Sequence, residues 1–376
     1  MTSSNIRFIG LDVHKESIEI AIAEDGINGE VRRFGTIGGT KDAFKKALRK
    51  LVSQAGTLHF CYEAGPCGYE LYRLIRSEGH SCTVIAPSLI PKKPGDKVKT
   101  DKRDAIALAR LFRAGELTAV YVPNPEDEAI RDLSRAREEC VSTRTKAKQR
   151  LKSFLLRHDI RCPHSANWNE AHLRWLAEVK LPHPASQIVY QEYLNAVTES
   201  VQREKRLLGE IEKHVKQWRL YPAVVSLMAL RGVRMVVAST MIAELGDLSR
   251  FPHPKQLMSY LGLTPSEYSS GDRQKRGAIT KCGNNHARSM LIEAAWNYRF
   301  HPKVSREMQK RQENIPIAIR DIAWKAQLRL THRYQAMTRM KKNPNIIVVA
   351  IARELVAFMW AIFNELDMTP RTESYC

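Results

Sequence analysis

The stretch IRFIGLDVHKESIEIAIAE, residues 6–24, decides how the N-terminal part of the chain folds. Its two halves, 6–13 and 17–24, are short runs rich in β-branched residues, and only the tripeptide HKE lies between them. Such a tight connection between two strand-like runs is typical of a β-hairpin. An acid, Asp12, follows the apolar FIGL near the end of the first run. We therefore expect a hairpin whose first strand ends at a carboxylate.

The residues after this hairpin alternate between strand and helix patterns. The periods and flanking residues predict strands at 31–37, 58–64 and 81–87 and helices at 40–54, 68–79 and 100–116. Thr40 is a suitable N-cap for the first of these helices. Three strands followed by alternating helices and strands predict an α/β fold for this part of the chain.

From about residue 125 the chain changes to long helical segments. Residues 126–158 contain neither Pro nor Gly, residues 185–218 contain one Gly, and a Pro-containing connector at 161–184 separates them. Two long helices joined in this way predict an antiparallel coiled-coil hairpin. The hairpin can serve as a helical spacer and dimer contact, or its basic side can touch RNA or DNA. The sequence leaves both readings open.

The C-terminal part is expected to combine helices with a basic loop. Residues 227–251 place a Gly-Val turn between two helical runs, which fits either an ordinary helical turn or a helix-hairpin-helix whose turn amides meet a phosphate. Residues 260–296 read as a Gly- and Ser-rich loop with many basic residues, and residues 301–376 as further helices. This part of the chain is mainly helical in our prediction.

The composition points to a nucleic-acid partner. The chain has 376 residues, enough for two or three domains, and its 43% hydrophobic content excludes a wholly disordered protein. The formal net charge of +20 and the pI of about 9.7 predict a polyanionic partner. Residues 221–376 hold 23 Lys and Arg against 12 Asp and Glu, so this part is the best candidate for binding phosphates.

The sequence also predicts a soluble, cytoplasmic protein without a membrane contact. The N-terminus has no signal-peptide core. The seven cysteines include no C-x-x-C pair, so neither a disulfide framework nor a zinc ribbon is indicated. The most apolar stretch, 345–366, is interrupted by Arg353 and Glu354 and therefore reads as a buried helix rather than a membrane span.

Four acids stand at positions that suit a metal site. Asp12 and Glu63 end predicted strands, and Asp101 and Asp104 share one helix face because they are three residues apart. Turn formation could explain Asp12 and a helix-start charge Asp101, but Glu63 follows an apolar run and needs a partner. Mg²⁺ is held by a few carboxylates together with waters and substrate phosphates, so the four acids predict a site for phosphodiester chemistry.

Four blocks of the sequence resemble the DEDD transposases of IS110/IS1111-type insertion sequences, a family that includes bridge-RNA-guided recombinases. The blocks are FIGLDVHK, YEAGPCGYELYR, KTDKRDAIALARL and YLGLTPSEYSSGDRQKRGAITKCGNNHARSMLIEAAW, and the resemblance runs from about residue 6 to 300. It implies that Asp12, Glu63, Asp101 and Asp104 are the catalytic metal ligands, with Mg²⁺ or Mn²⁺ as the ion. The implied parts are a RuvC-like, ribonuclease-H-type domain at 1–125, a coiled-coil dimerisation segment at 126–220, a serine-containing transposase domain at 221–300 and C-terminal helices at 301–376.

The segment EYSSGDRQKRG places two serines on a Gly-containing basic loop. From the residues alone a Ser-Gly turn with a basic flank explains it, since His286, seventeen residues beyond Ser269, is no evident base. The resemblance instead implies that Ser269 is a nucleophile that forms a covalent phosphoserine link with DNA, with Ser270 as the adjacent alternative. The predicted nucleic-acid contacts are Arg273, Lys275, Arg276, Lys281 and Arg288.

These features predict a transposase that excises and inserts a mobile element. The resemblance implies donor and target DNA, a noncoding bridge RNA, and dimers that pair into tetramers in a prokaryotic, nucleoid-associated setting. The alternative is a RuvC-like junction-resolving metal nuclease in which Ser269 is structural. A non-enzymatic nucleic-acid-binding regulator would explain the charge but not the four acids. An actin-like ATPase is disfavoured because the usual second glycine is absent from GLDVHK.

Overall fold

The computed structural model describes residues 6–26, 28–53, 56–91, 100–163, 167–268 and 276–366. The chain divides into two compact units, Met1–Val122 and Pro123–Cys376. The predicted four-part division of the chain by function stays a prediction.

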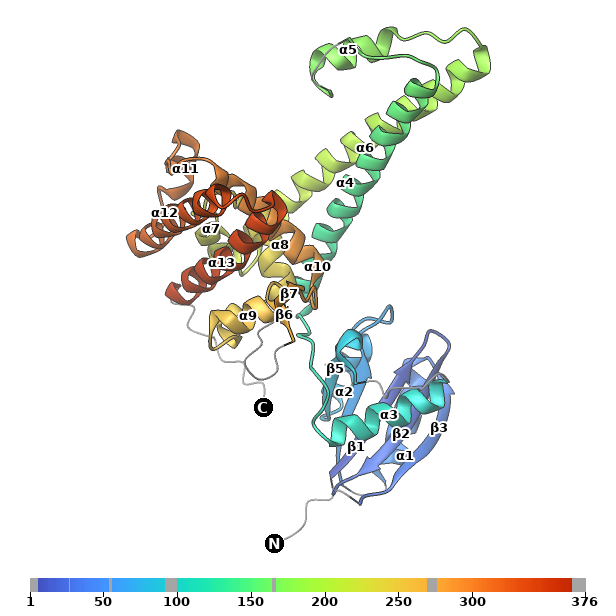
Figure 1. Cartoon of the computed structure of the whole chain (residues 1–376). Coiled ribbons are helices and arrows are strands. Elements are labelled where there is room, and N and C mark those ends of the chain that lie inside the picture. Colours follow the sequence, from blue (N-terminus) through green and yellow to red (C-terminus); the bar gives the residue numbers. More distant parts are fainter. Residues whose placement is uncertain are drawn as a thin grey trace. The chain divides into compact units, whose positions relative to one another are not determined.

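The N-terminal unit is built on a five-stranded sheet (Figure 1). Its strands are β1 (Ile6–Val13), β2 (Ser17–Glu24), β3 (Val31–Gly38), β4 (Thr57–Glu63) and β5 (Ser81–Ile85). Their order across the sheet is β3-β2-β1-β4-β5. The strand β1 pairs antiparallel with β2 and parallel with β4. The predicted hairpin and the three further strands are confirmed.

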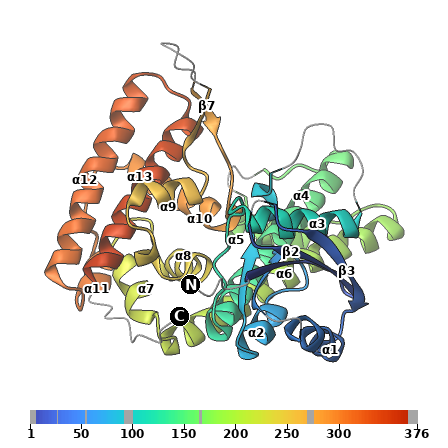
Figure 2. The ribbon, with the colours of Figure 1, turned by 90° about the horizontal axis from the view of Figure 1, so that it is seen from below.

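Helices cover both faces of this sheet. The helices α1 (Lys41–Val52) and α2 (Glu70–Ser77) lie on one face and α3 (Asp101–Arg113) on the other (Figure 2), while a short 3-10 helix, η1 (Pro87–Leu89), follows β5. Successive residues of a strand point to opposite faces. Ile9 and Leu11 of β1 therefore join the core under α1 and α2. Gly10 and Asp12 belong to the α3 face.

Gly10 allows α3 to lie directly on β1. A Cβ atom at Gly10 would stand 2.4 Å from the carbonyl oxygen of Ala105 and 2.5 Å from the backbone nitrogen of Ala109. Both partners are main-chain atoms of α3, so no side-chain rotation could relieve the clash. The contact between strand and helix at this point is therefore one of backbone against backbone.

The C-terminal unit is mainly helical, as predicted. Its helices are α4 (Pro125–Arg157), α5 (Glu170–Glu178), α6 (Pro184–Gln217), α7 (Tyr221–Leu227), α8 (Met235–Leu245), α9 (Pro254–Tyr260), α10 (Asn285–Ala295), α11 (Arg306–Gln312), α12 (Ile317–Arg339) and α13 (Pro344–Glu365). Two 3-10 helices, η2 (Leu248–Arg250) and η3 (Trp296–Arg299), and the strands β6 (Pro265–Glu267) and β7 (Arg276–Ile279) complete it.

The two long helices α4 and α6 lie side by side as a hairpin (Figure 1). Glu204 of α6 pairs with both Arg137 and Arg144 of α4, and the thiol of Cys140 points to the carbonyl oxygen of Ser200. Their bounds agree closely with the predicted helices at 126–158 and 185–218. A coiled-coil geometry for the pair stays a prediction.

Two expectations for this unit were wrong in detail. The predicted connector at 161–184 contains a helix, α5, whose Leu176 packs into the core at the tip of the hairpin. The predicted loop at 260–296 contains the antiparallel pair β6–β7 and the helix α10. The strands were missed because each is only three or four residues long, too short for a period to show.

The apolar helix α13 is a core helix. It is long and apolar enough to cross a membrane by length and composition. However, every residue from 347 to 363 is buried or half-buried, and its apolar side chains join those of α7, α8, α10 and α12 in one core. Glu354 pairs with Arg329 and Arg333 of α12. The predicted buried helix is thus confirmed.

Candidate metal-binding and catalytic site

Two of the four predicted acids end neighbouring strands of the N-terminal sheet. Leu11 of β1 pairs with Tyr62 of β4 in parallel register, so the next residues, Asp12 and Glu63, stand level with each other at the carboxyl ends of the two strands. Cys61, two residues before Glu63, packs against α3. Because side chains alternate along a strand, both acids belong to the face that α3 covers.

The other two acids reach the same end of the sheet because α3 runs opposite to β1. Phe112 near the end of α3 meets Phe8 near the start of β1, with ring centroids 5.6 Å apart, and Ala105 lies over Gly10. The first turn of α3 therefore approaches the carboxyl end of β1. Asp101 and Asp104 both lie in this turn.

His14 connects the two acidic elements. Its Nε2 lies 3.3 Å from Oδ2 of Asp12 and 3.7 Å from Oδ1 of Asp101. One ligand atom from each of these three residues lies within 4.8 Å of the others. The Asp12 side chain is 17% exposed and that of Asp101 66%. The cluster therefore has a half-buried base on β1 and an edge that is open to solvent.

The pKa of Asp12 is raised by its surroundings. Partial burial raises the pKa of its carboxyl group above the usual value, and the charges of Asp101 and Asp104 raise it further, while His14 lowers it. A cation among such like charges relieves their repulsion. The carboxylate oxygens suit Mg²⁺ or Mn²⁺, whereas an imidazole nitrogen suits these ions less well. The acids thus fit a divalent cation, with His14 as the hydrogen-bond partner of Asp12.

A fifth acid beside the cluster, Glu19 of β2, has other partners. It stands directly opposite Asp12 in the hairpin, and its buried carboxylate accepts hydrogen bonds from Arg33 and Thr36. The hydrogen bond from Arg33 is the main reason why the pKa of Glu19 is lowered. Arg33 therefore balances the negative charge of Glu19, which lies beside the site.

Part of the predicted C-terminal site lies outside the described residues. This holds for Ser269, Ser270, Arg273 and Lys275. Arg276 is exposed on β7 and stands 3.8 Å from Glu267, and Lys281 is exposed after that strand. The Arg288 side chain is buried and donates hydrogen bonds to the carbonyl oxygens of Leu261 and Cys282. Arg288 thus holds a turn together, and its contact with nucleic acid stays a prediction.

Sequence reasoning did not assign a role to His14 or Glu19. The signal for His14 was its position two residues after Asp12, which the hairpin reading treated as part of a turn. The signal for Glu19 was an acid in an otherwise apolar strand, the same argument that pointed to Glu63. Neither pairing could be derived without the strand register.

Comparisons with known proteins agree with this arrangement. A family described as "Transposase IS116/IS110/IS902 family" matches residues 225–310, and a DEDD transposase family of the IS110 type matches residues 9–159. The protein named "Putative transposase y4qE" of Sinorhizobium fredii is 47% identical over 96% of this chain and 90% of its own length. The transposase of insertion sequence IS1533 of Leptospira borgpetersenii is 31% identical, over 89% of this chain and 98% of its own.

A more distant relative is the pilin gene-inverting protein of Moraxella bovis, which is 23% identical over 82% of this chain and 81% of its own length. The family matches cover the strands and helix that carry the acids as well as the helices around β6 and β7. The relatives align over most of both units. The chain belongs to the IS116/IS110/IS902 family of transposases.

Proposed function

We propose that the protein excises and inserts an insertion sequence by serine attack on DNA phosphodiesters. Ser269 would be the nucleophile, and Asp12, Glu63, Asp101 and Asp104 would hold the Mg²⁺ or Mn²⁺ that assists it. The observation that carries the proposal is the approach of Asp12 and Asp101 at the carboxyl end of β1, within reach of one nitrogen of His14. When bound, a divalent cation would neutralise phosphate charge and activate an attacking oxygen.

The topology of the N-terminal unit supports a RuvC-like, ribonuclease-H-type domain. Three antiparallel strands in the order β3-β2-β1 continue into the parallel pair β4-β5. Acids from β1, from β4 and from the start of α3 then gather at one end of the sheet. In this arrangement each acid comes from a rigid element, which is what a site for in-line phosphoryl chemistry requires.

A recombinase explains the comparisons better than a nuclease that only cuts. One relative is named for inverting a gene, and inversion requires that broken strands are joined again. A serine ester with DNA would retain the energy of the broken phosphodiester, so rejoining would need no ATP. The partners in this proposal are donor and target DNA, a guiding noncoding RNA and further copies of the chain, at the nucleoid of a bacterial cell.

The first test of this proposal is the dependence of DNA cleavage on a divalent cation. We expect the purified full-length protein to cut DNA that carries the ends of its element, and to stop when EDTA removes divalent cations. Added Mg²⁺ or Mn²⁺ should restore cutting, measured as nicked and rejoined products on a denaturing gel. Cleavage that continues at the same rate in EDTA would refute the role of the acids.

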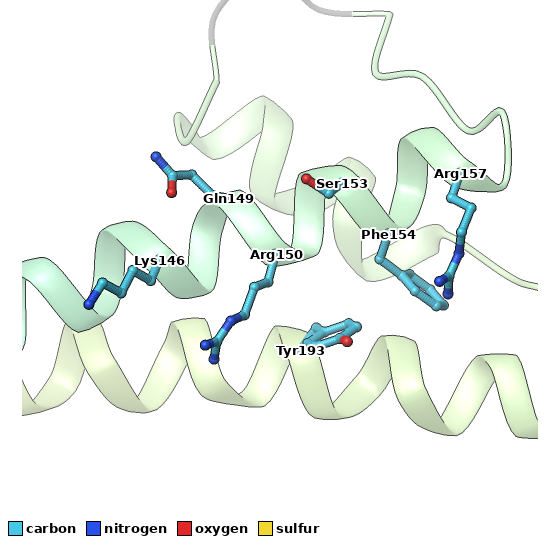
Figure 3. A pocket seen from close by; sticks show the side chains of 7 residues that line it. All are labelled: Lys146, Gln149, Arg150, Ser153, Phe154, Arg157 and Tyr193. Atoms are coloured by element: carbon cyan, nitrogen blue, oxygen red, sulfur yellow. The ribbon is translucent and has the colours of Figure 1, made fainter.

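The helical hairpin offers a surface for the RNA. A hollow of about 450 Å³ lies between α4 and α6. Figure 3 shows its lining: Arg150 and Arg157 lie on either side of the rings of Tyr193 and Phe154, and Lys146 lies farther along α4, beyond Arg150. The two rings meet edge to face with centroids 5.4 Å apart, and the Arg157 guanidinium lies 5.3 Å from the Phe154 ring centre.

Among the described residues, no acid lines this hollow, whose other two lining residues are Gln149 and Ser153. Exposed cations beside the half-buried Tyr193 ring, which packs on the buried Phe154, suit a strand whose phosphates pair with the cations and whose unpaired bases stack on Tyr193. We assign the hollow to an unpaired segment of the guiding RNA. This assignment favours the nucleic-acid reading of the hairpin over that of a spacer alone.

Changes in the hollow should weaken RNA binding more than equal changes elsewhere on the hairpin. Arg150→Ala with Arg157→Ala should lower the salt slope of binding by about 1 to 2, since each lost phosphate contact removes nearly one released counterion. Tyr193→Leu should cost about 1–3 kcal/mol through lost stacking. Binding of the copurified, sequenced RNA is measured at several salt concentrations. Arg203→Ala with Lys205→Ala, two exposed cations of α6, is the matched control, and equal effects of both pairs would contradict the assignment.

A further inference from the structure

A nitrogen stands beside the Asp12 and Asp101 carboxylates, where the four predicted acids would suggest a third oxygen. Nε2 of His14 lies 3.3 Å from Oδ2 of Asp12 and 3.7 Å from Oδ1 of Asp101. Among the described residues, these three side chains form the group whose ligand atoms all lie within 4.8 Å of one another, and neither Glu63 nor Asp104 belongs to it. The tightest part of the site therefore combines two oxygens with one imidazole nitrogen.

The main chain holds His14 at this place. Its backbone N–H donates a hydrogen bond to the carbonyl oxygen of Ser17, which closes the turn between β1 and β2. A Cβ atom at Gly39 would stand 2.3 Å from the carbonyl oxygen of Lys15, so the same turn packs directly on the backbone that follows β3. The backbone of His14 is therefore fixed relative to β1, while its side chain, 54% exposed, has room to rotate.

The two distances are long for hydrogen bonds but suit ligands that share one ion. Charge-assisted N–H···O bonds measure about 2.7–2.9 Å, whereas Nε2 of His14 lies 3.3 Å from Asp12 and 3.7 Å from Asp101. Neighbouring ligands of an octahedral ion with bonds of about 2.0–2.1 Å stand about 3 Å apart. Small rotations of the exposed His14 and Asp101 side chains would therefore bring all three atoms onto one cation.

The exposure of the three side chains leaves room for a substrate beside the ion. Asp12 is the most buried of them, whereas His14 and Asp101 are both exposed. Three protein ligands on an octahedral ion leave further positions for waters and phosphate oxygens, which a catalytic ion requires. A ligand role for His14 is therefore compatible with the binding of a DNA phosphate to the same ion.

An imidazole ligand changes which ions the cluster prefers. Carboxylates and waters suit Mg²⁺ and Mn²⁺, whereas imidazole favours later ions of the first transition row, and affinity rises from Mn²⁺ to Co²⁺. A neutral ring binds through the lone pair of Nε2 and carries its proton on Nδ1, where water can accept a hydrogen bond because the side chain is exposed. His14 should therefore strengthen Co²⁺ binding and add little to Mg²⁺ binding.

We propose that His14 is a direct ligand of the cation that Asp12 and Asp101 hold, and that it shifts the preference of this site from Mg²⁺ towards transition-metal ions. The inference rests on the proposed function, because it assumes the metal site. In the free protein His14 is the hydrogen-bond partner of Asp12. In the loaded protein the ion takes the place of this hydrogen bond and joins the two side chains.

The first test detects the nitrogen directly. Electron spin-echo spectroscopy of Mn²⁺ bound to the full-length protein should show coupling to an imidazole nitrogen. His14→Gln keeps an amide donor for Asp12 but has no imidazole, so the coupling should disappear in this variant. His80→Gln is the matched control and should keep the coupling. His80 belongs to the same unit but directly precedes β5, at the opposite end of the parallel strands from Asp12.

The second test compares two ions by calorimetry. His14→Gln should lower the affinity for Co²⁺ about tenfold or more and the affinity for Mg²⁺ by less than about threefold. A histidine that only holds Asp12 in position through a hydrogen bond would weaken the binding of both ions equally. The ratio of the two affinities therefore separates a ligand from a positioning residue.

Nitrogen coupling that is absent from the unaltered protein, or that persists in His14→Gln, would overturn the ligand role. So would an equal change of the two affinities, or no change in either. Melting curves check folding, and His14→Ala repeats both tests if the Gln variant is unfolded. Failure of the proposed metal site would show separately, as Mn²⁺ binding that is the same in Asp12→Asn as in the unaltered protein.

Discussion

The Asp12→Asn and Asp101→Asn variants should each lose DNA cleavage by about 10³-fold or more, because a bound cation contributes several kcal/mol of charge stabilisation and each 1.36 kcal/mol is a factor of ten. Asparagine has the same shape but no charge, so the fold should be kept. Cleavage rates are measured together with Mn²⁺ binding by calorimetry. Both should fall in the same variants, since the two acids contribute to one cluster.

A second helix supplies the control for this loss. Asp42 stands in the first turn of α1 as Asp101 stands in the first turn of α3, and threonines, Thr40 and Thr100, cap the two helices in the same way. Asp42→Asn therefore removes the same helix-start charge, worth about 0.3–1 kcal/mol, without touching the site. If Asp42→Asn reduces cleavage as much as Asp101→Asn, the loss comes from helix stability and the metal assignment is wrong.

The Ser269→Ala variant should abolish covalent attachment of the protein to DNA. Alanine has no hydroxyl, so no phosphoserine ester can form and no strand can be rejoined through it. The attachment is detected as a labelled DNA–protein band that survives denaturation, and the modified peptide is mapped by mass spectrometry. A metal nuclease would behave differently, because it cuts with activated water and should keep its cleavage rate in this variant.

The neighbouring serine makes this experiment decisive. Ser270→Ala removes the same atom from the adjacent residue and should retain the attached band. If Ser270→Ala alone loses the band, the nucleophile is Ser270 and the serine mechanism stands with its residue reassigned. If both variants still cut DNA at the normal rate and neither parent nor variant forms a band, the junction-resolving nuclease is the better description.

The N-terminal fold could be predicted because each of its strands and helices has a clear pattern of apolar and polar residues within its own segment. The runs at 6–13 and 17–24 are apolar enough to be buried strands and are joined by a connection too short for anything but a hairpin. Asp12 and Glu63 stood out as acids at the ends of such runs. Their common face follows from alternation alone once β1 and β4 are known to be parallel neighbours.

The remaining features depend on pairs that are far apart in the chain. In the C-terminal unit the side chains of Glu244 and His286 meet although 42 residues separate them, and nothing in either segment indicates the other. The strands β6 and β7 have little apolar character because none of their residues is fully buried. Sequence patterns report burial and periodicity; they do not report which polar side chains meet across an interior.

In the proposed site, the backbone contact at Gly10 would bear on the choice of ion. Strand and helix touch there without an intervening side chain, so the main chains that carry Asp12 and Asp101 meet at a set distance close to these acids. A set distance between the chains that carry the ligands would favour one ion radius, and Mg²⁺–oxygen distances of about 2.0–2.1 Å are shorter than the 2.3–2.6 Å of Ca²⁺. Main-chain packing, and not the identity of the ligands, would then disfavour calcium.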